Sequence, residues 1–345
     1  MTLLGVHMAR EINEQSEMFQ RILDNSQHII RVAHAIRDTA PRTVLFAGRG
    51  TSDHAALYAK YLTEIELGLP AGLMSPSTIT TYGARPNLKD VLVIVVSQSG
   101  GSPDLVETAT VARECGATVL AVTNNPDSAL VSAVNFHINV FAGPELAVAA
   151  TKSFTAQMLS LRIFFDAWLN KEHGELHQLP ERARLLASRT DEFDVIASSY
   201  NDISRLVVTG RGYAYPTALE ASLKIMETTY LDAHAFSGAD LLHGPMALID
   251  ETHPVIAIAP DGKAFSAMQP VLERLTSSTD RLFVLSGAQG SNLGNMNFTN
   301  SHNLGEDLSP LLDIIAMQNI ILRMAVNRGI NPDEPRGLKK VTQTW

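Results

Sequence analysis

The chain has 345 residues, of which 45% are hydrophobic and 18% charged, enough for two cores of ordinary domain size and too apolar for a disordered chain. Its 27 basic and 36 acidic residues give a net charge of −9 without any basic run or basic-aromatic stripe, which argues against nucleic acid as a partner. An anionic ligand would therefore need local attraction from helix N-termini and a few lysines or arginines.

No segment predicts a membrane span, a secretion signal or a metal site. The longest aliphatic run, residues 91–96, is far shorter than the ~20 residues that a membrane helix needs, and residues 10–17 are polar and acidic. The single cysteine, Cys115, cannot form an internal disulfide or a cysteine-rich metal site, and the 11 histidines lack a metal-binding spacing. We therefore expect a cytoplasmic protein with no membrane partner and no bound metal.

The N-terminal region predicts helix, and the unit that follows it occurs twice. Residues 1–41 carry apolar side chains at roughly helical spacing and end at Pro41. Residues 43–62, TVLFAGRGTSDHAALYAKYL, then indicate a short strand, a glycine turn and a helix. The stretch that begins at Leu206 repeats this plan as LVVTGRGYAYPTALEASLKI.

Two landmarks of the repeat have the same offset. The Gly-Arg-Gly triplets start at Gly48 and Gly210, and the next strands end at Gly100 and Gly262, so both pairs are 162 positions apart. Each half continues with a helix and another strand, at 117–124 and 281–287. Alternating strands and helices predict an α/β fold with two tandem domains, each a doubly wound parallel sheet flanked by helices.

Domain boundaries are expected where apolar helices give way to polar segments or to proline and glycine. The last helix is expected at 311–328, before Gly329 and two prolines that break regular structure. The predicted parts are an N-terminal helical segment (1–41), a first domain (42–170), a connecting helical segment (171–200), a second domain (201–328) and a tail (329–345).

The strongest local motif is SQSGGS at 97–102, between an apolar strand and a helix that begins near Pro103. Its glycines let backbone N–H groups point at a ligand, its serine and glutamine side chains donate hydrogen bonds, and the helix N-terminus adds partial positive charge. These features suit a phosphate, although a serine-rich turn with a helix cap explains this segment alone equally well. No Gly-Lys-Ser/Thr follows, which argues against nucleoside triphosphate chemistry.

Thr51 and Ser52 open the helix after the first Gly-Arg-Gly turn. The ends of adjacent parallel strands converge at one edge of a sheet, so Thr51 and Ser52 could help to hold the same phosphate. The alternative is that these two residues cap the helix. Asp53 replaces the third glycine of a dinucleotide fingerprint, so a dinucleotide site is not expected. The second half has lost these hydroxyls: it carries Tyr213 and Ala214, and Ala259, Pro260 and Asp261, at the corresponding positions.

The second half has instead a helix on which Glu220, Lys224 and Glu227 share one face. A solvated charged face explains this spacing as well as a functional site does. His243 follows in a loop bounded by glycine and proline, and a histidine near a carboxylate and a lysine can move protons close to neutral pH. Glu145 precedes a helix that is expected to begin at Thr151. From its position it is interpreted as an acid in a loop or as a charge at the helix terminus.

Taken together, SQSG after the second strand, ALEASLKIMETTY followed by LLHGP, and a Pro-Arg…Lys tail on two tandem halves resemble a known family. They are similar to the isomerase half of glucosamine-6-phosphate synthase and to free-standing type II glucosamine-6-phosphate deaminases, both built from tandem SIS (sugar isomerase) domains. The resemblance runs from about Thr43 to the end of the chain. It implies two SIS-type domains, a phosphosugar ligand and no cofactor.

By matching position, the resemblance implies a role for each candidate residue. The phosphate would be held by Thr51, Ser52, Ser97, Gln98, Ser99 and Ser102. Glu227 would move the proton between C1 and C2 with support from Lys224, and His243 would open the sugar ring. In this family the histidine loop comes from the neighbouring subunit, which implies a homodimer with shared active sites.

The tail and one loop acid complete the implied site. Lys340 resembles the lysine that reaches the sugar carbonyl, and Arg336 would orient the tail. Glu145 is placed with the substrate-binding residues.

Several departures from the synthases favour a single-chain reaction. The chain starts MTLLGVH, so we expect no glutaminase domain with an N-terminal cysteine. Gly101 and Asp240 stand where synthases have Glu, and the tail reads KKVTQT where they have KSVTVE. We therefore expect a deaminase that converts glucosamine-6-phosphate to fructose-6-phosphate and ammonia.

Rival readings share these motifs. A fructosamine-6-phosphate deglycase, a galactosamine-6-phosphate deaminase or a plain phosphosugar isomerase would use the same residues. A phosphosugar sensor without catalysis is a different class, against which stand the retained Glu227, Lys224, His243 and Lys340.

Overall fold

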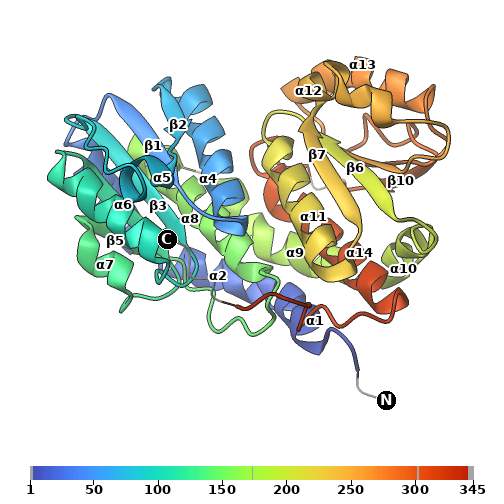
Figure 1. Cartoon of the computed structure of the whole chain (residues 1–345), viewed down its shortest axis with the longest axis horizontal. Coiled ribbons are helices and arrows are strands. Elements are labelled where there is room, and N and C mark those ends of the chain that lie inside the picture. Colours follow the sequence, from blue (N-terminus) through green and yellow to red (C-terminus); the bar gives the residue numbers. More distant parts are fainter. Residues whose placement is uncertain (1–2, 173, 301–302, 341–345) are drawn as a thin grey trace. The chain divides into compact units, whose positions relative to one another are not determined.

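Two five-stranded parallel sheets organise the chain (Figure 1). The structure is a computed structural model that describes residues 3–172, 174–300 and 303–340. The first-sheet unit comprises Glu14–Glu145, Ala150–Pro180 and the described tail after Gly337. The second-sheet unit comprises the described residues up to Asn13, Leu146–Ala149 and Glu181–Gly337.

The N-terminal region forms three helices rather than one continuous helix. They are α1 (Val6–Asn13), α2 (Gln15–Asp24) and α3 (Ser26–Arg37). Helix α1 belongs to the second-sheet unit, where the carboxylate of Asp333 accepts hydrogen bonds from the N–H groups of His7 (2.9 Å) and Met8 (2.8 Å). Helices α2 and α3 pack on α8 (Lys152–Leu169) in the first-sheet unit.

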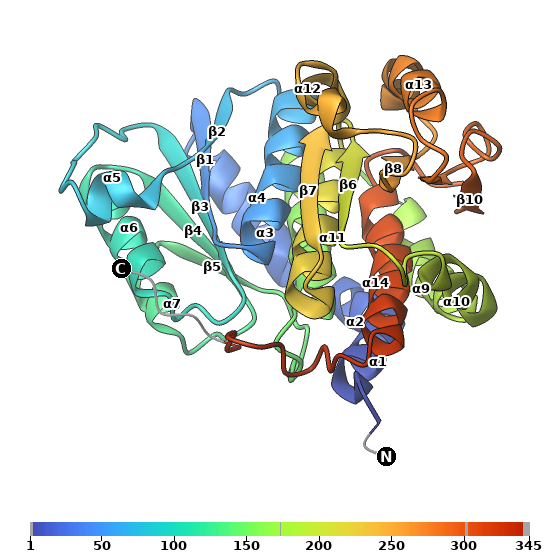
Figure 2. The ribbon, with the colours of Figure 1, turned by 45° about the vertical axis from the view of Figure 1, so that its right-hand side comes forward.

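The first sheet has the strand order β2-β1-β3-β4-β5, and every neighbouring pair is parallel. Its strands are β1 (Thr43–Ala47), β2 (Ala71–Leu73), β3 (Val91–Ser97), β4 (Thr118–Thr123) and β5 (Phe136–Asn139). Its other helical segments are α4 (Thr51–Leu62), a π-helical turn (Thr63–Leu67), α5 (Pro76–Thr80), α6 (Pro103–Glu114), α7 (Ala129–Ala133) and a 3-10 turn (Gly174–Gln178). Figure 2 shows α5, α6 and α7 on one face of the sheet and α3 and α4 on the other.

The second sheet has the order β10-β9-β8-β6-β7, again with parallel neighbours. Its strands are β6 (Arg205–Gly210), β7 (Asp232–Ser237), β8 (Val255–Ala259), β9 (Leu282–Ser286) and β10 (Met296–Thr299). Its other helical segments are α9 (Leu179–Ala187), α10 (Thr190–Ser198), α11 (Ala214–Thr229), α12 (Gly238–Leu242), a 3-10 turn (Pro245–Leu248), α13 (Lys263–Thr276) and α14 (Ser309–Asn327). Helix α11 packs along β6 and β7, as Figures 1 and 2 show.

The two sheets confirm the internal repeat and the doubly wound α/β fold. Strands β1 to β5 correspond in order and position to β6 to β10, so β3 and β8 are the central strands. Val93 and Val95 of β3 are fully buried and pack with Leu105 and Ala109 of α6. Burying a valine side chain stabilises a fold by roughly 1.5–3 kcal/mol, which explains why a strand that is apolar up to its terminal Ser97 takes the centre of a covered sheet.

Helix α14 is, among the described residues, the one helix long and apolar enough to cross a membrane. Its apolar window has a mean hydropathy of 1.3, but 89% of that window is buried inside the protein. The helix packs on α10 and α11. It is therefore a core helix of the second-sheet unit.

Candidate functional site

The phosphate loop candidate lies at the carboxyl end of β3 in the first-sheet unit. Ser97 is the last residue of β3 and is 5% exposed, and Ser102 is the N-cap residue of α6. The hydroxyl of Ser97 accepts a hydrogen bond from the N–H of Gly100 (3.1 Å), and the hydroxyl of Ser99 accepts one from Gly101 (3.2 Å). Gly100 has φ of 63°, a left-handed conformation that glycine adopts without strain. Gln98 is half-buried in the same turn. The four polar residues of the loop therefore lie together at the N-terminus of α6: Ser97, Gln98, Ser99 and Ser102.

A second loop of the same unit carries Thr51 and Ser52, the first two residues of α4. Strand β1, which precedes this loop, is hydrogen-bonded directly to β3, so both loops leave the same edge of the sheet. The ion pair between Arg49 Nε and Asp104 Oδ2 (2.8 Å) joins the two loops. The structure therefore confirms that the two hydroxyl loops converge.

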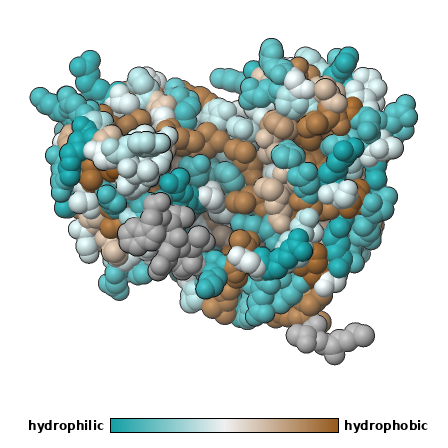
Figure 3. Space-filling model, viewed as in Figure 1, coloured by the Kyte–Doolittle hydropathy of each residue, from teal (hydrophilic) through white to brown (hydrophobic). Residues whose placement is uncertain are grey.

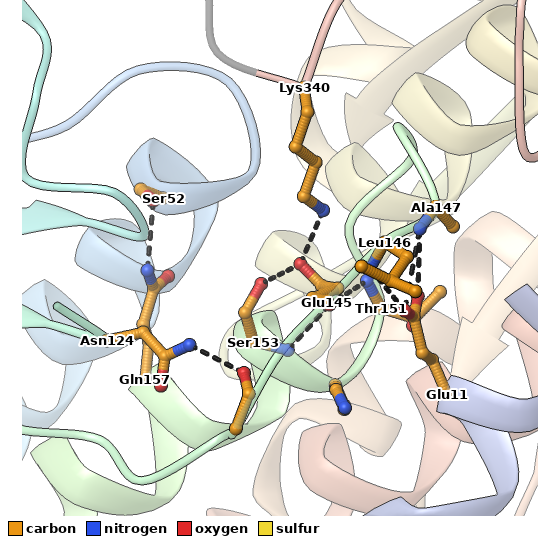
Figure 4. A network of polar contacts seen from close by, with 12 residues as sticks. Glu11, Ser52, Asn124, Glu145, Leu146, Ala147, Thr151, Ser153, Gln157 and Lys340 are labelled. Atoms are coloured by element: carbon orange, nitrogen blue, oxygen red, sulfur yellow. Dashed lines mark hydrogen bonds and ion pairs between the residues drawn. The ribbon is translucent and has the colours of Figure 1, made fainter. Parts of the chain in front are cut away.

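A buried glutamine of α8 positions Ser52 through a hydrogen bond. Ser52 is 7% exposed, and its hydroxyl accepts a hydrogen bond from Nε2 of Gln157 on α8 (3.0 Å), as Figure 4 shows. Beside it, burial raises the pKa of Asp53, against the opposing charges of His54 and Arg49. Gln157 was not predicted as a site residue, although a glutamine in an apolar helix is a signal that could have drawn attention to it.

Glu145 and Lys340 meet in the first-sheet unit. The fully buried carboxylate of Glu145 accepts hydrogen bonds from the N–H groups of Thr151 and Ser153 (both 3.0 Å) and from the Ser153 hydroxyl (2.7 Å). Nζ of Lys340 lies 2.7 Å from the same carboxylate (Figure 4). Burial alone would raise the pKa of Glu145, but the Lys340 ammonium and the Ser153 donors lower it below its ordinary value. The side chain is thus an ionised anchor for the tail and for the start of α8.

In the second-sheet unit, α11 places one lysine between two carboxylates. Lys224 is 1% exposed; its Nζ lies 3.5 Å from Glu220 and donates a hydrogen bond to Glu227. Burial lowers the pKa of Lys224, but the two carboxylates outweigh it and the net shift is upward. Glu220 is fully buried, whereas the Glu227 side chain is 22% exposed. The face is therefore a buried ion cluster in which Glu227 is the carboxylate that reaches solvent, and the alternative of a solvated charged face is wrong.

His243 is not joined to this cluster within the chain. It is the C-cap residue of α12 and is exposed. Within the described ranges, its imidazole has no hydrogen-bond or ion-pair partner. The expected pairing with a carboxylate and a lysine is therefore not formed by a direct contact in a single chain.

Arg336 attaches the tail to the end of α11. Its N–H donates a hydrogen bond to the Tyr230 hydroxyl (2.8 Å), and its guanidinium lies 4.1 Å from the centre of the Tyr230 ring. Tyr230 ends α11 in a left-handed conformation, with φ of 58°. The structure thus groups the hydroxyl loops, Glu145 and Lys340 in one unit, and Lys224, Glu227, His243 and Arg336 in the other.

The described part of the chain contains no cluster of side chains suited to bind a metal ion. No group of three or more His, Cys, Asp or Glu side chains there could hold a metal ion.

Comparison with known sequences identifies the repeated unit. The family model of the SIS domain matches residues 39–167 and again residues 199–327. The isomerising glutamine–fructose-6-phosphate aminotransferase of Thermococcus kodakarensis is 31% identical over 346 residues, which covers 96% of this chain and 57% of that protein. The isomerising glutamine–fructose-6-phosphate aminotransferase 1 of Arabidopsis thaliana is 31% identical over 317 residues, which covers 88% of this chain and 47% of that protein. The chain thus spans about half the length of these relatives.

Solved structures share the whole fold. A protein from Silicibacter pomeroyi DSS-3, provisionally assigned as a phosphosugar isomerase, is 32% identical with a TM-score of 0.85, covering 94% of this chain and 99% of that one. Glucosamine-6-phosphate deaminase from Thermotoga maritima has a TM-score of 0.80 over 98% of this chain and 100% of that one, but at 21% identity it supports the fold alone.

The predicted resemblance is confirmed by two matched domains and by relatives aligned along nearly the whole chain. The chain belongs to the SIS domain family, as a tandem pair of SIS domains related to the isomerase half of glucosamine-6-phosphate synthase.

Proposed function

We propose that this chain is an isomerising deaminase that converts glucosamine-6-phosphate and water to fructose-6-phosphate and ammonia. The observation that carries the proposal is the α11 cluster, in which buried Lys224 holds Glu227 while that carboxylate remains partly open to solvent. A carboxylate fixed on a rigid helix is suited to carry one proton between two adjacent carbons. A solely structural ion cluster would not need its outer carboxylate exposed.

The substrate phosphate is assigned to the converging loops of the first-sheet unit. Thr51, Ser52 and the 97–102 loop offer hydroxyls and helix N-termini at one sheet edge. Lys340, held by Glu145, is assigned to the sugar carbonyl. Its ammonium is suited to stabilise negative charge that develops on the carbonyl oxygen.

The reaction balances without a metal or organic cofactor. His243 gives a proton to the ring oxygen as its bond to C1 breaks and takes up the proton of the C1 hydroxyl, so that the sugar opens to its aldehyde form. Glu227 removes the C2 proton, the C2–H electron pair forms the C1–C2 double bond, and Lys340 gives a proton to the carbonyl oxygen. Glu227 returns its proton to C1, the nitrogen lone pair forms the C2–N double bond, and the nitrogen gives up a proton to Lys340, which leaves an imine at C2. Water adds at C2, ammonia leaves, and fructose-6-phosphate remains.

Exposure of His243 supports a homodimer with shared active sites. Leu242 and Leu248, on either side of it in the chain, are 43% and 50% exposed. Figure 3 shows apolar residues interspersed among polar ones on the visible face of each unit. Apolar side chains next to an exposed functional histidine are typical of a surface that a second subunit covers.

We also propose that the protein is cytoplasmic. We propose that the first SIS domain comprises residues 42–170 and the second SIS domain residues 201–328.

A plain phosphosugar isomerase is the second candidate. The match to the Silicibacter pomeroyi protein along 99% of that chain favours it. The Gly at position 101, where synthases have Glu, favours a single-chain reaction over a synthase and is compatible with both candidates.

Release of ammonia separates the two candidates. Purified enzyme is incubated with glucosamine-6-phosphate, galactosamine-6-phosphate, a fructosamine-6-phosphate and glucose-6-phosphate, and ammonia and ketose phosphate are both measured. The deaminase yields equal amounts of ammonia and fructose-6-phosphate from the first substrate. Ketose phosphate from glucose-6-phosphate, with no ammonia from any amino sugar, would establish the isomerase instead.

A further inference from the structure

The carboxylate of Glu306 lies at the N-terminus of α13 in the second-sheet unit. Glu306 is in the loop between β10 and α14, and its two oxygens accept hydrogen bonds from the N–H groups of Lys263 (2.6 Å) and Ala264 (3.0 Å). These are the first two residues of a 14-residue helix, whose leading N–H groups have no partner within the helix. Glu306 is therefore bound as an anion at a helix N-terminus.

This position is the repeat counterpart of the candidate phosphate loop. Lys263 and Ala264 stand 162 positions after Gly101 and Ser102. Helix α13 follows the central strand β8 as α6 follows the central strand β3. The same place in the fold thus has open hydroxyls in one unit and a carboxylate in the other.

Two glycines show how closely the carboxylate fits between the strand-end loops. A β-carbon added at Gly262 would lie 2.3 Å from Oε2 of Glu306, and one added at Gly212 would lie 3.9 Å from Oε1. Gly212 belongs to the Gly-Arg-Gly turn after β6, the counterpart of the turn that precedes Thr51. The carboxylate therefore lies near both loops, as a phosphate held by the equivalent pair of loops in the first-sheet unit would.

A second acid at this edge disfavours an external anion. Asp261, the counterpart of Ser99, accepts hydrogen bonds from the N–H groups of Ala288 (2.8 Å) and Gln289 (2.9 Å). Its negative charge adds to that of Glu306. A phosphate dianion would have to displace one carboxylate and approach another.

We propose that Glu306 is a built-in anion that fills, in the second SIS domain, the position that corresponds to the candidate phosphate loop of the first. The comparison with a phosphate rests on the proposed function of the first-sheet unit; the occupation of the α13 N-terminus by Glu306 does not. Removal of the carboxylate uncovers an anion site made by the Lys263 and Ala264 amides.

The test uses inorganic phosphate and the amide signals of the full-length protein in heteronuclear NMR. In Glu306→Ala, the Lys263 and Ala264 signals should shift saturably as phosphate is added, whereas in the wild type they should stay in place. Glu273→Ala removes an exposed acid of the same helix and should behave like the wild type. Equal shifts in the wild type, or none in Glu306→Ala, would overturn the proposal.

A conservative variant guards against loss of fold. Glu306→Gln keeps the shape of the side chain and removes its charge, so the two amide protons should move upfield as charge-assisted hydrogen bonds weaken. Unchanged amide signals in Glu306→Gln would contradict the proposal. The Gly101 and Ser102 amide signals of the wild type report separately on the first-sheet unit. If these signals do not respond to fructose-6-phosphate, the proposed function is wrong. The assignment of Glu306 is judged from the Lys263 and Ala264 signals alone.

Discussion

Nζ of Lys340 lies 2.7 Å from the carboxylate of Glu145, although 195 positions separate the two residues in the chain. The same carboxylate binds the first turn of α8 through Thr151 and Ser153. One buried acid therefore fixes both the end of the described tail and the start of a core helix.

The first prediction concerns the stability that Glu145 provides. Glu145→Gln keeps an acceptor oxygen but loses the charge, and we expect it to lower the free energy of unfolding at pH 7.5 by ~1.5–3 kcal/mol. Because the folded-state pKa of Glu145 lies below its ordinary value of 4.5, this contribution is complete above pH 4.5 and is lost as the pH falls through the folded-state pKa. Urea unfolding of both proteins at several pH values measures it. A difference that grows toward acid pH would contradict the assignment; Glu107→Gln, at an exposed position, is the control.

The second prediction separates the catalytic part of the tail from its structural part. A chain ending at Gly337 keeps the contacts of Asp333 with α1 and of Arg336 with Tyr230, but lacks Lys340. It should remain folded but with a lower Tm, because the buried Glu145 carboxylate loses its Lys340 partner, and it should lose ~10²-fold or more in kcat, as when a positioned charge donor is removed. Lys340→Ala should do the same.

Two controls accompany the tail experiment. A chain ending at Gly329 also loses the contacts of Asp333 with α1 and should therefore melt at a still lower temperature. Lys339→Ala removes an exposed neighbour and should leave kcat unchanged. Normal turnover in the chain that ends at Gly337 would exclude Lys340 from the reaction.

The third prediction tests the phosphate loop. The Ser97→Ala, Ser99→Ala double variant should raise KM for a phosphorylated substrate, because each hydrogen bond to a charged oxygen contributes ~1.5–3 kcal/mol. That corresponds to roughly tenfold or more in KM for each serine. Steady-state kinetics checks this, with the exposed Ser77→Ala as control. An unchanged KM would remove these serines from the phosphate site.

The fourth prediction concerns a buried acid in α14. Burial raises the pKa of Asp313 to about 7, aided by the charge of Asp261 and opposed by the hydrogen bond from Asn300 (2.8 Å). Since this pKa is raised above its ordinary 3.8, the folded state holds the proton more tightly, and stability falls as the pH rises from about 4 to about 7. Asp313→Asn should therefore exceed the wild type in unfolding free energy by ~2–4 kcal/mol at pH 8 and by much less at pH 4. Equal differences at both pH values, compared with the exposed Asp280→Asn control, would contradict this account.

The sequence predicted the central elements of the fold better than its edges. Strands such as β3 and β8 were expected because every side chain in them, apart from the terminal Ser97 of β3, is apolar, as a strand covered on both faces requires. The three-residue strand β2 and the polar strand β7 were not, because an edge strand depends on its neighbour's hydrogen bonds rather than on its own pattern. The α11 cluster was predicted by helical spacing.

Contacts distant in sequence could not be predicted in the same way. The pairing of Lys340 with Glu145 and of Gln157 with Ser52 depends on how the loops and helices of one unit come together. The glycine loop before α13 also gave no sign of Glu306, since that residue is supplied from 43 positions away. Local patterns carry no information about such partners.

The last prediction concerns Glu227, which we expect to be the base. Lys224 fixes its carboxylate from the buried side, and 22% of the Glu227 side chain is exposed to solvent. Glu227→Gln keeps the shape and an acceptor for Lys224 but cannot take a proton. We therefore expect kcat to fall by ~10²–10⁴ while phosphosugar binding and the unfolding transition are kept. Glu251→Gln, at an exposed acid of the same unit, should leave kcat unchanged.

Solvent exchange supplies an independent measurement of the same step. If Glu227 carries the proton from C2 to C1, wild-type enzyme in D₂O should place some solvent deuterium at C1 of the fructose-6-phosphate, because a proton on a partly exposed carboxylate exchanges with water during its lifetime. The extent of labelling, read by NMR or mass spectrometry, is set by how well the bound substrate excludes water. Deuterium at C1 together with an inactive Glu227→Gln identifies the base, since neither result alone separates a proton carrier from a residue that only positions Lys224. Normal turnover in Glu227→Gln would remove this residue from the mechanism and leave Glu145 or Glu220 as the carboxylate to test.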